Sequence, residues 1–150
     1  MGHGGVYMQE SAGRLIAVLY RKSQIYWTQA LKEYGITSAE YPVLIELHKQ
    51  DGRTQEDVAA ALDIDKSFIT RTIQSLLEKE FIEKKKDEND KRCNRIYLTK
   101  KGYHTKEPIE RAIVGWNKCL VGELPEDEVI GVLSQMIENI QKTKVTNRKD

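Results

Sequence analysis

Apolar residues recur at a helical spacing after Asp65 and give way to a strand-like pattern after Glu80. The apolar positions of the helical stretch share one face, and they are Ile69, Ile73, Leu76 and Leu77. The polar positions of the opposite face are Lys66, Ser67, Thr70, Arg71 and Gln74. Asp65 precedes the first turn, where a carboxylate accepts free backbone N–H groups. The pattern predicts an amphipathic helix capped by Asp65 and followed by extended chain.

Two strand-like runs, residues 81–86 and 94–98, flank the polar loop 87–93 and predict a β-hairpin. Upstream, residues 54–62 predict a short helix whose brief link to Asp65 requires a sharp crossing. Such a helix pair followed by a hairpin is a winged helix-turn-helix, whose second helix enters the major groove of DNA. An ordinary helix pair in a bundle is the alternative, and the hairpin with its basic loop favours the first interpretation.

Helices are predicted on both sides of this module, so the expected fold class is mainly α, or α+β with the two-stranded wing counted. The expected flanking helices span about residues 9–34, 37–50, 100–121 and 125–141. Thr37 and Glu40 form a capping box, and Pro108 is expected to bend the helix that contains it. The expected parts of one integrated domain are an N-terminal dimerisation segment, the winged helix-turn-helix and C-terminal dimerisation helices, at residues 1–36, 37–98 and 99–150.

The terminal helices carry more apolar surface than a winged helix of about 65 residues can cover. Their apolar positions recur at helical spacing, as at Leu15, Val18 and Leu19 in the first helix and Val129, Val132 and Leu133 in the last. A dimerisation layer is the simplest explanation, and it predicts a homodimer. An intrachain helical bundle is the alternative.

Charge is concentrated rather than abundant, because the 150-residue chain has a net charge of only +1. Residues 84–101 contain eight basic and three acidic side chains, a local net charge of +5. A concentrated basic segment of this kind indicates a nucleic-acid partner more than the total charge does. The alternative is a solvated charged face.

Several classes of protein are not indicated. Cys93 and Cys119 are far apart and have no metal-like spacing, which predicts free thiols in a reducing, cytoplasmic compartment. No apolar run approaches the ~20 residues that cross a bilayer, and the first residues lack the pattern of a secretory signal. Motifs of metalloproteases, serine hydrolases, phosphate-binding loops and thiol oxidoreductases are missing. We therefore expect no enzyme, no metal site, no cofactor and no membrane partner.

Three strings carry a resemblance to a known family. They are TSAEYPVLIEL from Thr37, TQEDVAAALDIDKSFITRTIQSLLEKEFIEK from Thr54, and Asp87-x-x-Asp90-x-Arg92 followed by Ile96-Tyr97-Leu98-Thr99-x-x-Gly102. On these strings the chain resembles the MarR family of bacterial transcriptional regulators, over roughly residues 10–142. The last string is the most specific, since its spacing links a hairpin tip to a helix start.

The resemblance implies a homodimeric repressor that binds double-stranded DNA and is released by a small-molecule or oxidant signal. In the family, the recognition helix enters the major groove and an arginine at the wing tip lies in or along the minor groove. Arg92 matches that arginine, and Asp90 matches the acid that orients it. Two-fold symmetry predicts a pseudo-palindromic operator. The expected DNA-binding residues are Lys66, Ser67, Thr70, Arg71, Gln74, Lys84, Lys86, Asp90 and Arg92.

Two positions depart from the family pattern. Glycine is usual between the recognition helix and the wing, where this chain has Glu80, and it is common in the preceding turn, where this chain has Asp63. Either these residues adopt a conformation that favours glycine, or the two turns differ slightly in shape. Neither position belongs to the expected DNA contacts.

Regulation is predicted less sharply. The resemblance places a small aromatic or lipophilic effector between the dimerisation layer and the winged helix, and the expected lining residues are Tyr26, Trp27, Tyr41, His48 and Trp116. The alternative for each is an ordinary core or interface aromatic. Cys93 lies beside cations that lower a thiol pKa, which makes it a candidate redox residue, with a neutral surface thiol as the alternative. A helical protein-interaction module without DNA binding is the competing function.

Overall fold

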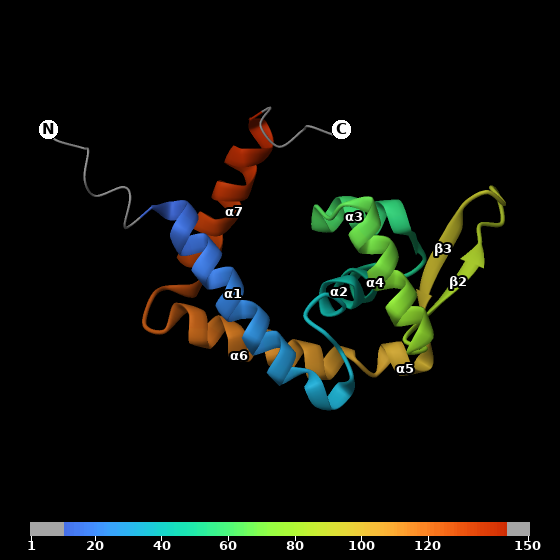
Figure 1. Ribbon diagram of the computed structural model, residues 1–150, viewed down its shortest axis with the longest axis horizontal. Helices are drawn as coiled ribbons and strands as arrows, with labels where there is room; N and C mark the ends of the chain where they lie inside the picture. Colours follow the sequence, from blue (N-terminus) through green and yellow to red (C-terminus); the bar gives the residue numbers. More distant parts are fainter. Residues whose placement is uncertain (1–10, 144–150) are drawn as a thin grey trace, which may run out of the picture. The chain divides into compact units, whose positions relative to one another are not determined.

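The computed structural model describes residues 11–143, and the chain forms two compact units. The first unit is Met1–Ala112 and the second is Ile113–Asp150. Each is described by itself below. The elements in chain order are α1 (Ala12–Ala30), η1 (Lys32–Tyr34), α2 (Tyr41–Lys49), β1 (Arg53–Thr54), α3 (Gln55–Leu62), α4 (Lys66–Glu78), β2 (Ile82–Lys86), β3 (Asn94–Leu98), α5 (Lys100–Tyr103), α6 (Lys106–Val121) and α7 (Glu126–Lys142) (Figure 1).

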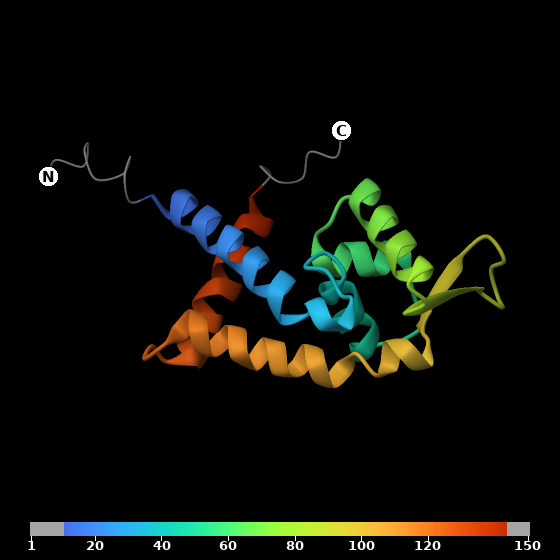
Figure 2. The same cartoon turned by 60° about the horizontal axis from the view of Figure 1, so that its bottom comes forward.

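The predicted mainly helical fold with a hairpin is confirmed. β2 and β3 pair antiparallel, from Ile82 opposite Leu98 to Lys86 opposite Asn94. We call this hairpin and its loop, residues 82–98, the wing; it projects from the C-terminal end of α4 (Figures 1 and 2). The sheet also has a short third strand that the sequence did not indicate, because β1 pairs with β3 in the order β1-β3-β2.

The core of the first unit is built from the apolar positions that the periodicity selects. On α4, Ile69, Ile73 and Leu76 are at most 1% exposed, whereas Leu77 is half-buried. They join buried residues of α2, α3 and the wing, which are Val43, Leu44, Leu47, Val58, Ile82, Ile96 and Leu98. Burial of one face of α4 leaves its opposite face toward solvent.

The first predicted helix is divided. We expected it over about residues 9–34, but α1 ends at Ala30 and continues as the short 3-10 helix η1. Ser11 caps the start of α1 by accepting from the Arg14 N–H, and the predicted start at Gln9 lies outside the described residues. Gly35 ends η1 with a φ of 69°, which glycine adopts readily.

The helix expected over residues 100–121 is also two helices, and its predicted bend at Pro108 is wrong. The chain breaks at His104 and Thr105, between α5 and α6. Pro108 lies in the first turn of α6, where a missing N–H removes no helical hydrogen bond. Just after α5, the Thr105 hydroxyl donates to the carbonyl of Gly102 within the helix, at 2.6 Å. The break therefore has a local polar contact that the periodicity of apolar residues cannot show.

Close contact between α5 and the end of α4 explains the Leu-Thr-x-x-Gly string. Thr99 caps α5 as predicted, by accepting from the Gly102 N–H. A Cβ on Gly102 would lie 2.1 Å from the Phe81 carbonyl oxygen, so only glycine fits there without displacing backbone. The Thr99 hydroxyl donates to the Glu80 carbonyl and the Lys101 ammonium to the Lys79 carbonyl. The carbonyls that follow α4 are thus satisfied by side chains from α5.

The second unit contains the end of α6 and all of α7. Glu126, Asp127 and Glu128 occupy the first turn of α7, as predicted from the helix dipole, while Pro125 takes the capping position rather than the first helical one. The apolar stripe of α7 is exposed in this chain, from Val132 at 54% to Ile140 at 54%. Cys119 was expected in a core or interface, and its side chain is exposed.

Candidate nucleic-acid interface

The solvent face of α4 presents the five polar side chains that its periodicity selects. Lys66, Ser67, Thr70, Arg71 and Gln74 are all exposed. Asp65 caps the helix by accepting from the Phe68 N–H at 2.8 Å. This bond, with a second from the Ser67 hydroxyl, holds the pKa of Asp65 below its ordinary value. A charged cap at this end fixes where the polar face begins.

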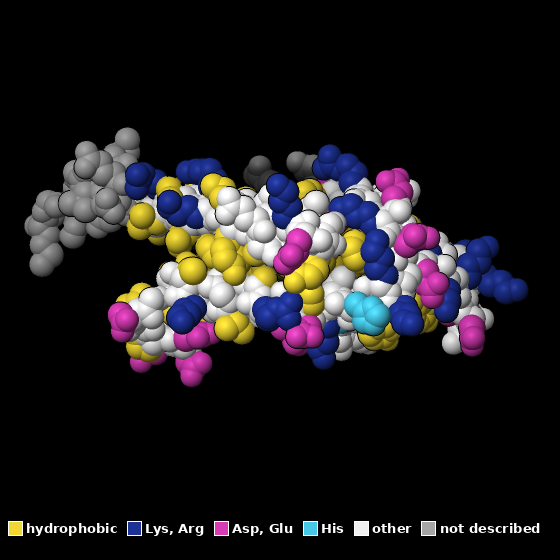
Figure 3. Space-filling view, turned by 90° about the horizontal axis from the view of Figure 1, so that it is seen from below, with side chains coloured by type: hydrophobic (Ala, Val, Ile, Leu, Met, Phe, Trp, Pro, Cys, Tyr) yellow, Lys and Arg dark blue, Asp and Glu magenta, His cyan; other side chains and the backbone are white. Residues whose placement is uncertain are grey.

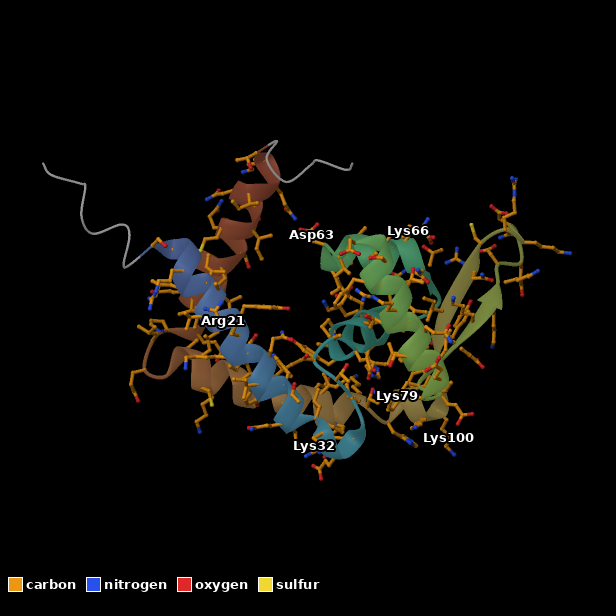
Figure 4. The ribbon with its side chains drawn as sticks, viewed as in Figure 1. Arg21, Lys32, Asp63, Lys66, Lys79 and Lys100 are labelled. Carbon is orange, nitrogen blue, oxygen red and sulfur yellow. The ribbon has the colours of Figure 1, made fainter. Side chains whose placement is uncertain are left out.

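The opposite end of α4 is held by a buried ion pair. Glu40 is 2% exposed and accepts from the Lys79 ammonium at 2.8 and 3.0 Å. The same carboxylate accepts from the Ser75 hydroxyl at 2.7 Å and keeps its predicted capping-box bond to the Thr37 N–H. Lys79 also donates to the Gly35 carbonyl. Figure 4 labels Lys66 and Lys79 at the two ends of the helix.

The two departures from the family pattern take left-handed backbone conformations. Asp63 has a φ of 52° and Glu80 a φ of 60°. Each costs about 1–2 kcal/mol relative to an ordinary conformation, because a Cβ crowds the neighbouring carbonyl. Of the two alternatives, the first therefore holds, because both residues adopt a conformation that favours glycine.

The wing places its lysines on two different faces. Alternation along β2 puts Lys84 and Lys86 on the face of the buried Ile82, and Lys85 on the other. Lys85 lies over the Tyr97 ring at 5.2 Å and pairs with Glu83 at 3.2 Å. Lys84 and Lys86 are exposed, and within residues 11–143 their side chains form no ion pair or cation–π contact. Those two are thus the lysines of this strand that remain available to an external anion.

Two acids organise the wing loop. Asp87 forms an ion pair with Arg95 and accepts from the Asn89 and Asp90 N–H groups, and these contacts hold the pKa of Asp87 below its ordinary value. Asp90 accepts from the Arg92 N–H at 3.0 Å and lies 3.7 Å from its Nε. The Arg92 side chain is 96% exposed. The loop therefore fixes the Arg92 backbone and leaves its guanidinium in solvent.

Cys93 behaves differently from our expectation. We predicted that neighbouring cations would lower its thiol pKa, but the Asp90 carboxylate, helped by partial desolvation, raises that pKa. The Cys93 thiol lies 3.6 Å from Asp90 Oδ2. The prediction was wrong because the nearest charge is the acid three residues earlier, not the adjacent arginine. A raised pKa reduces the thiolate that reacts with oxidants.

A hollow of about 180 Å³ separates the wing from the start of α3. Its walls are Gln55, Glu56, Lys84, Arg92, Cys93, Asn94 and Ile96. Gln55 also donates to the Thr70 hydroxyl of α4 at 2.8 Å. We did not single out Gln55 or Glu56 from the sequence, because they precede the recognition helix and carry no periodic signal.

Within the first unit, the predicted effector-lining residues fall in two places, an aromatic cluster and a separate contact of His48. Trp27 is 3% exposed, and its ring stacks on that of Tyr41 with 3.9 Å between ring centroids. The Tyr26 ring is edge-on to Trp27, with 5.3 Å between centroids. Burial raises the pKa of Tyr41 to about 12. His48 instead contacts Thr105 at 3.0 Å. Trp116 belongs to the second unit and is half-buried.

A cleft of about 670 Å³ lies within the first unit, between α1, α2 and the turn that precedes α4. Of the predicted lining residues, Tyr41 is the one on its wall, beside Tyr20 and Phe68. Within residues 11–143 no group of acidic, histidine or cysteine side chains is arranged to hold a metal ion. In the same range no helix has the length and apolarity to span a bilayer.

The helix pair α3–α4 with its crossing turn, the exposed polar face of α4 and the basic wing define a winged helix-turn-helix protein. This class binds DNA through the second helix of the pair.

Comparisons with known proteins identify the family. The MarR family model matches residues 34–92. A MarR transcriptional regulator from Methanosarcina mazei Go1 is 33% identical, with a TM-score of 0.80 over 87% of this chain and 96% of that one. The HTH-type transcriptional regulator BilQ of Clostridioides difficile (strain CD3) is 27% identical over 90% of this chain and 88% of its own length. Reduced AbfR bound to DNA is 25% identical, with a TM-score of 0.69 over 87% of this chain and 91% of that one.

The chain belongs to the MarR family and is a DNA-binding transcriptional regulator. The family consists of regulators rather than enzymes. The competing function of a helical interaction module without DNA binding is not supported by these relatives.

Proposed function

We propose that the protein is a homodimeric repressor that binds a pseudo-palindromic operator through α4 and the wing. The exposed polar face of α4, capped at one end and ion-paired at the other, is the observation that carries this proposal. The proposed DNA contacts are Lys66, Ser67, Thr70, Arg71, Gln74, Lys84, Lys86 and Arg92, with Asp90 positioning Arg92.

The major-groove contacts follow from side-chain chemistry. The Arg71 guanidinium lies 5.9 Å from the centroid of the Phe68 ring, and within residues 11–143 it forms no ion pair with a carboxylate. Its guanidinium is therefore free to make a bidentate contact to guanine. A contact to a phosphate is the other possibility for the same group. On the wing, Arg92 extends into solvent and suits a narrow minor groove, where the negative potential is enhanced.

Exposed apolar faces support the homodimer. On α1, Leu15, Ile16 and Leu19 are 43–54% exposed, and hydrophobic side chains are visible along this helix in Figure 3. On α7, Met136 and Ile137 are 43% and 59% exposed. Contiguous apolar surface of this kind marks a protein–protein interface.

The cleft beside Tyr41 is the proposed effector site. Its volume falls within the 300–1,000 Å³ typical of small-molecule sites. It borders Asp63, Ile64 and Asp65, so a bound molecule would contact the turn that positions α4. A small aromatic or lipophilic compound suits the aromatic walls, and its binding is proposed to release the operator. The Cys93 thiol lies 3.6 Å from Asp90 Oδ2, and this carboxylate disfavours the reactive thiolate, so a small molecule is favoured over an oxidant as the signal.

Selection of bound fragments from a random pool of double-stranded DNA tests the proposal. We expect an inverted repeat whose half-sites are centred about one helical turn, roughly 34–36 Å, apart. Sedimentation equilibrium of the free protein should give twice the chain mass. A consensus without two-fold symmetry, or a monomer at micromolar concentration, would contradict the dimeric operator complex. A selection that enriches no sequence at all would contradict specific DNA binding.

A further inference from the structure

The Thr70 hydroxyl on α4 is already engaged within the protein. It donates to the Lys66 carbonyl at 2.7 Å and accepts from Gln55 Nε2 at 2.8 Å. A hydroxyl has one proton and two acceptor lone pairs. With the proton and one lone pair in use, Thr70 has a single lone pair and its methyl group left for DNA. Thr70 thus faces DNA as an acceptor.

Gln55 comes from outside the recognition helix. It is the first residue of α3, and its side chain crosses to α4 to reach Thr70. It also lines the hollow that Lys84 and Arg92 of the wing share. Gln55 therefore lies between the two parts of the proposed interface. Its donor bond keeps the Thr70 proton directed away from Gln55, toward the Lys66 carbonyl.

We propose that Gln55 is a specificity-determining residue that positions the Thr70 hydroxyl as an acceptor. This inference rests on the proposed function and adds a sequence preference to it. In the major groove, adenine N6 and cytosine N4 are donors, thymine carries a methyl group, and guanine offers only the acceptors N7 and O6. An acceptor lone pair beside a methyl group suits the first three bases and repels guanine. Guanine is therefore excluded from the position that faces Thr70.

The neighbouring side chains show the same division of roles. The Ser67 hydroxyl donates to Asp65 at 2.9 Å, so Ser67 also faces DNA as an acceptor. Arg71 carries donors only. Where Arg71 contacts a base rather than a phosphate, α4 therefore favours guanine opposite Arg71, and it favours other bases opposite the two hydroxyls. This pattern differs from the one that freely rotating Ser67 and Thr70 hydroxyls, each able to donate or accept, would give.

The test uses Gln55→Met, which keeps the side-chain length and removes the donor, and Thr70→Val, which keeps the shape and removes the hydroxyl. Affinities are measured at one salt concentration for the selected operator with each of the four bases at every position. The position whose profile changes in Thr70→Val is the one that faces Thr70. At that position wild type should disfavour guanine by about tenfold, the order of one mismatched contact.

Gln55→Met should reduce the penalty against guanine to about threefold or less, because the hydroxyl is then held by one bond instead of two and can donate to guanine. Adding Gln55→Met to Thr70→Val should cause no further change at this position. Gln50→Met, at an exposed glutamine after α2 that is not among the proposed DNA contacts, is the matched control and should leave this profile unchanged. Unfolding temperatures of all variants should match wild type.

Two results would overturn the inference while the proposed function stands. One is an unchanged four-base profile in Gln55→Met, and the other is an equal loss of affinity for all four bases, which would make Gln55 a phosphate contact. If wild type itself shows no base preference at any position, the proposed function fails, and this outcome is distinguishable because it precedes any variant.

Discussion

The recognition helix and the wing tip are held in opposite ways. α4 has a charged cap at Asp65 and a buried ion pair between Glu40 and Lys79 at its end. Two of its surface hydroxyls are bonded to other protein groups. At the wing tip, by contrast, Arg92 is 96% exposed and its Nε lies 3.7 Å from the nearest carboxylate oxygen.

This difference separates two kinds of DNA recognition. Side chains in fixed geometry lose little freedom on binding and can discriminate between bases by hydrogen-bond direction. An exposed guanidinium on a loop can follow the shape and potential of the minor groove without fixed geometry. We therefore expect changes at the anchors of α4 to affect folding, and changes at the wing tip to affect DNA binding alone.

The largest effect is expected from Glu40→Ala. The substitution leaves the Lys79 ammonium, the Ser75 hydroxyl and the Thr37 N–H without the carboxylate they share. Breaking a buried pair from one side costs roughly 3 kcal/mol, at the low end because Lys79 is partly exposed. Urea unfolding at constant protein concentration measures this loss. Glu33→Ala, at an exposed acid, is the control, and equal stability of the two variants would show that the buried pair does not anchor α4.

Arg92→Ala should come next, with an effect on DNA alone. One well-placed arginine contact is worth about 1–3 kcal/mol, so operator affinity should fall at least about fivefold. The unfolding free energy should not change, because the Arg92 side chain is in solvent. Lys91→Ala removes the same charge from the neighbouring exposed position and should weaken binding less. Equal losses of affinity for the two variants in salt-controlled gel shifts would show that Arg92 contributes only its charge.

A subtler difference is expected between Lys84→Gln and Lys85→Gln. Lys84 is on the face that borders the hollow, whereas Lys85 pairs with Glu83 on the other face. If Lys84 neutralises one phosphate, its loss should flatten the slope of log affinity against log salt by about one unit. Lys85→Gln should leave the slope nearly unchanged. Identical slopes in the two variants would mean that the face of β2 on which a lysine lies does not decide whether it contacts a phosphate.

The smallest effect is expected on the reactivity of the Cys93 thiol. Asp90→Asn removes the charge that raises the Cys93 thiol pKa, so that pKa should fall toward its ordinary value. A larger thiolate fraction near pH 8 should speed alkylation of Cys93 by iodoacetamide a few-fold, because the thiolate is the reacting form. Cys119, exposed in the second unit, serves as the internal reference. A rate that stays constant or falls would assign the raised pKa to desolvation instead.

Local features of the winged helix could be predicted because short-range chemistry determines them. The capping bonds of Thr37 with Glu40, of Asp65 and of Thr99 each join residues three positions apart. The strands of the wing and the exposed face of α4 follow from periodicity alone. In these places the sequence pattern and the three-dimensional contact involve the same few residues.

Features that depend on distant contacts could not be predicted. The second role of Glu40, as partner of Lys79, joins residues 39 positions apart. Gln55 reaches Thr70 across the turn between two helices, and nothing in its neighbourhood marks it. The prediction for the Cys93 thiol pKa considered the cations next to it in sequence. In the structure the loop instead brings the Asp90 carboxylate close to the thiol. In each case the sequence shows the residues but not which of them are in contact.

The exposed tip of the wing has a consequence for the rates of binding. Arg92 and Lys91 stand in solvent, where long-range attraction to DNA acts before any base is contacted. Such charges raise the rate of association and make it sensitive to ionic strength, whereas bonds formed after docking mainly set the rate of dissociation. The wing would then determine how quickly an operator is found, and the engaged hydroxyls of α4 how long it stays occupied.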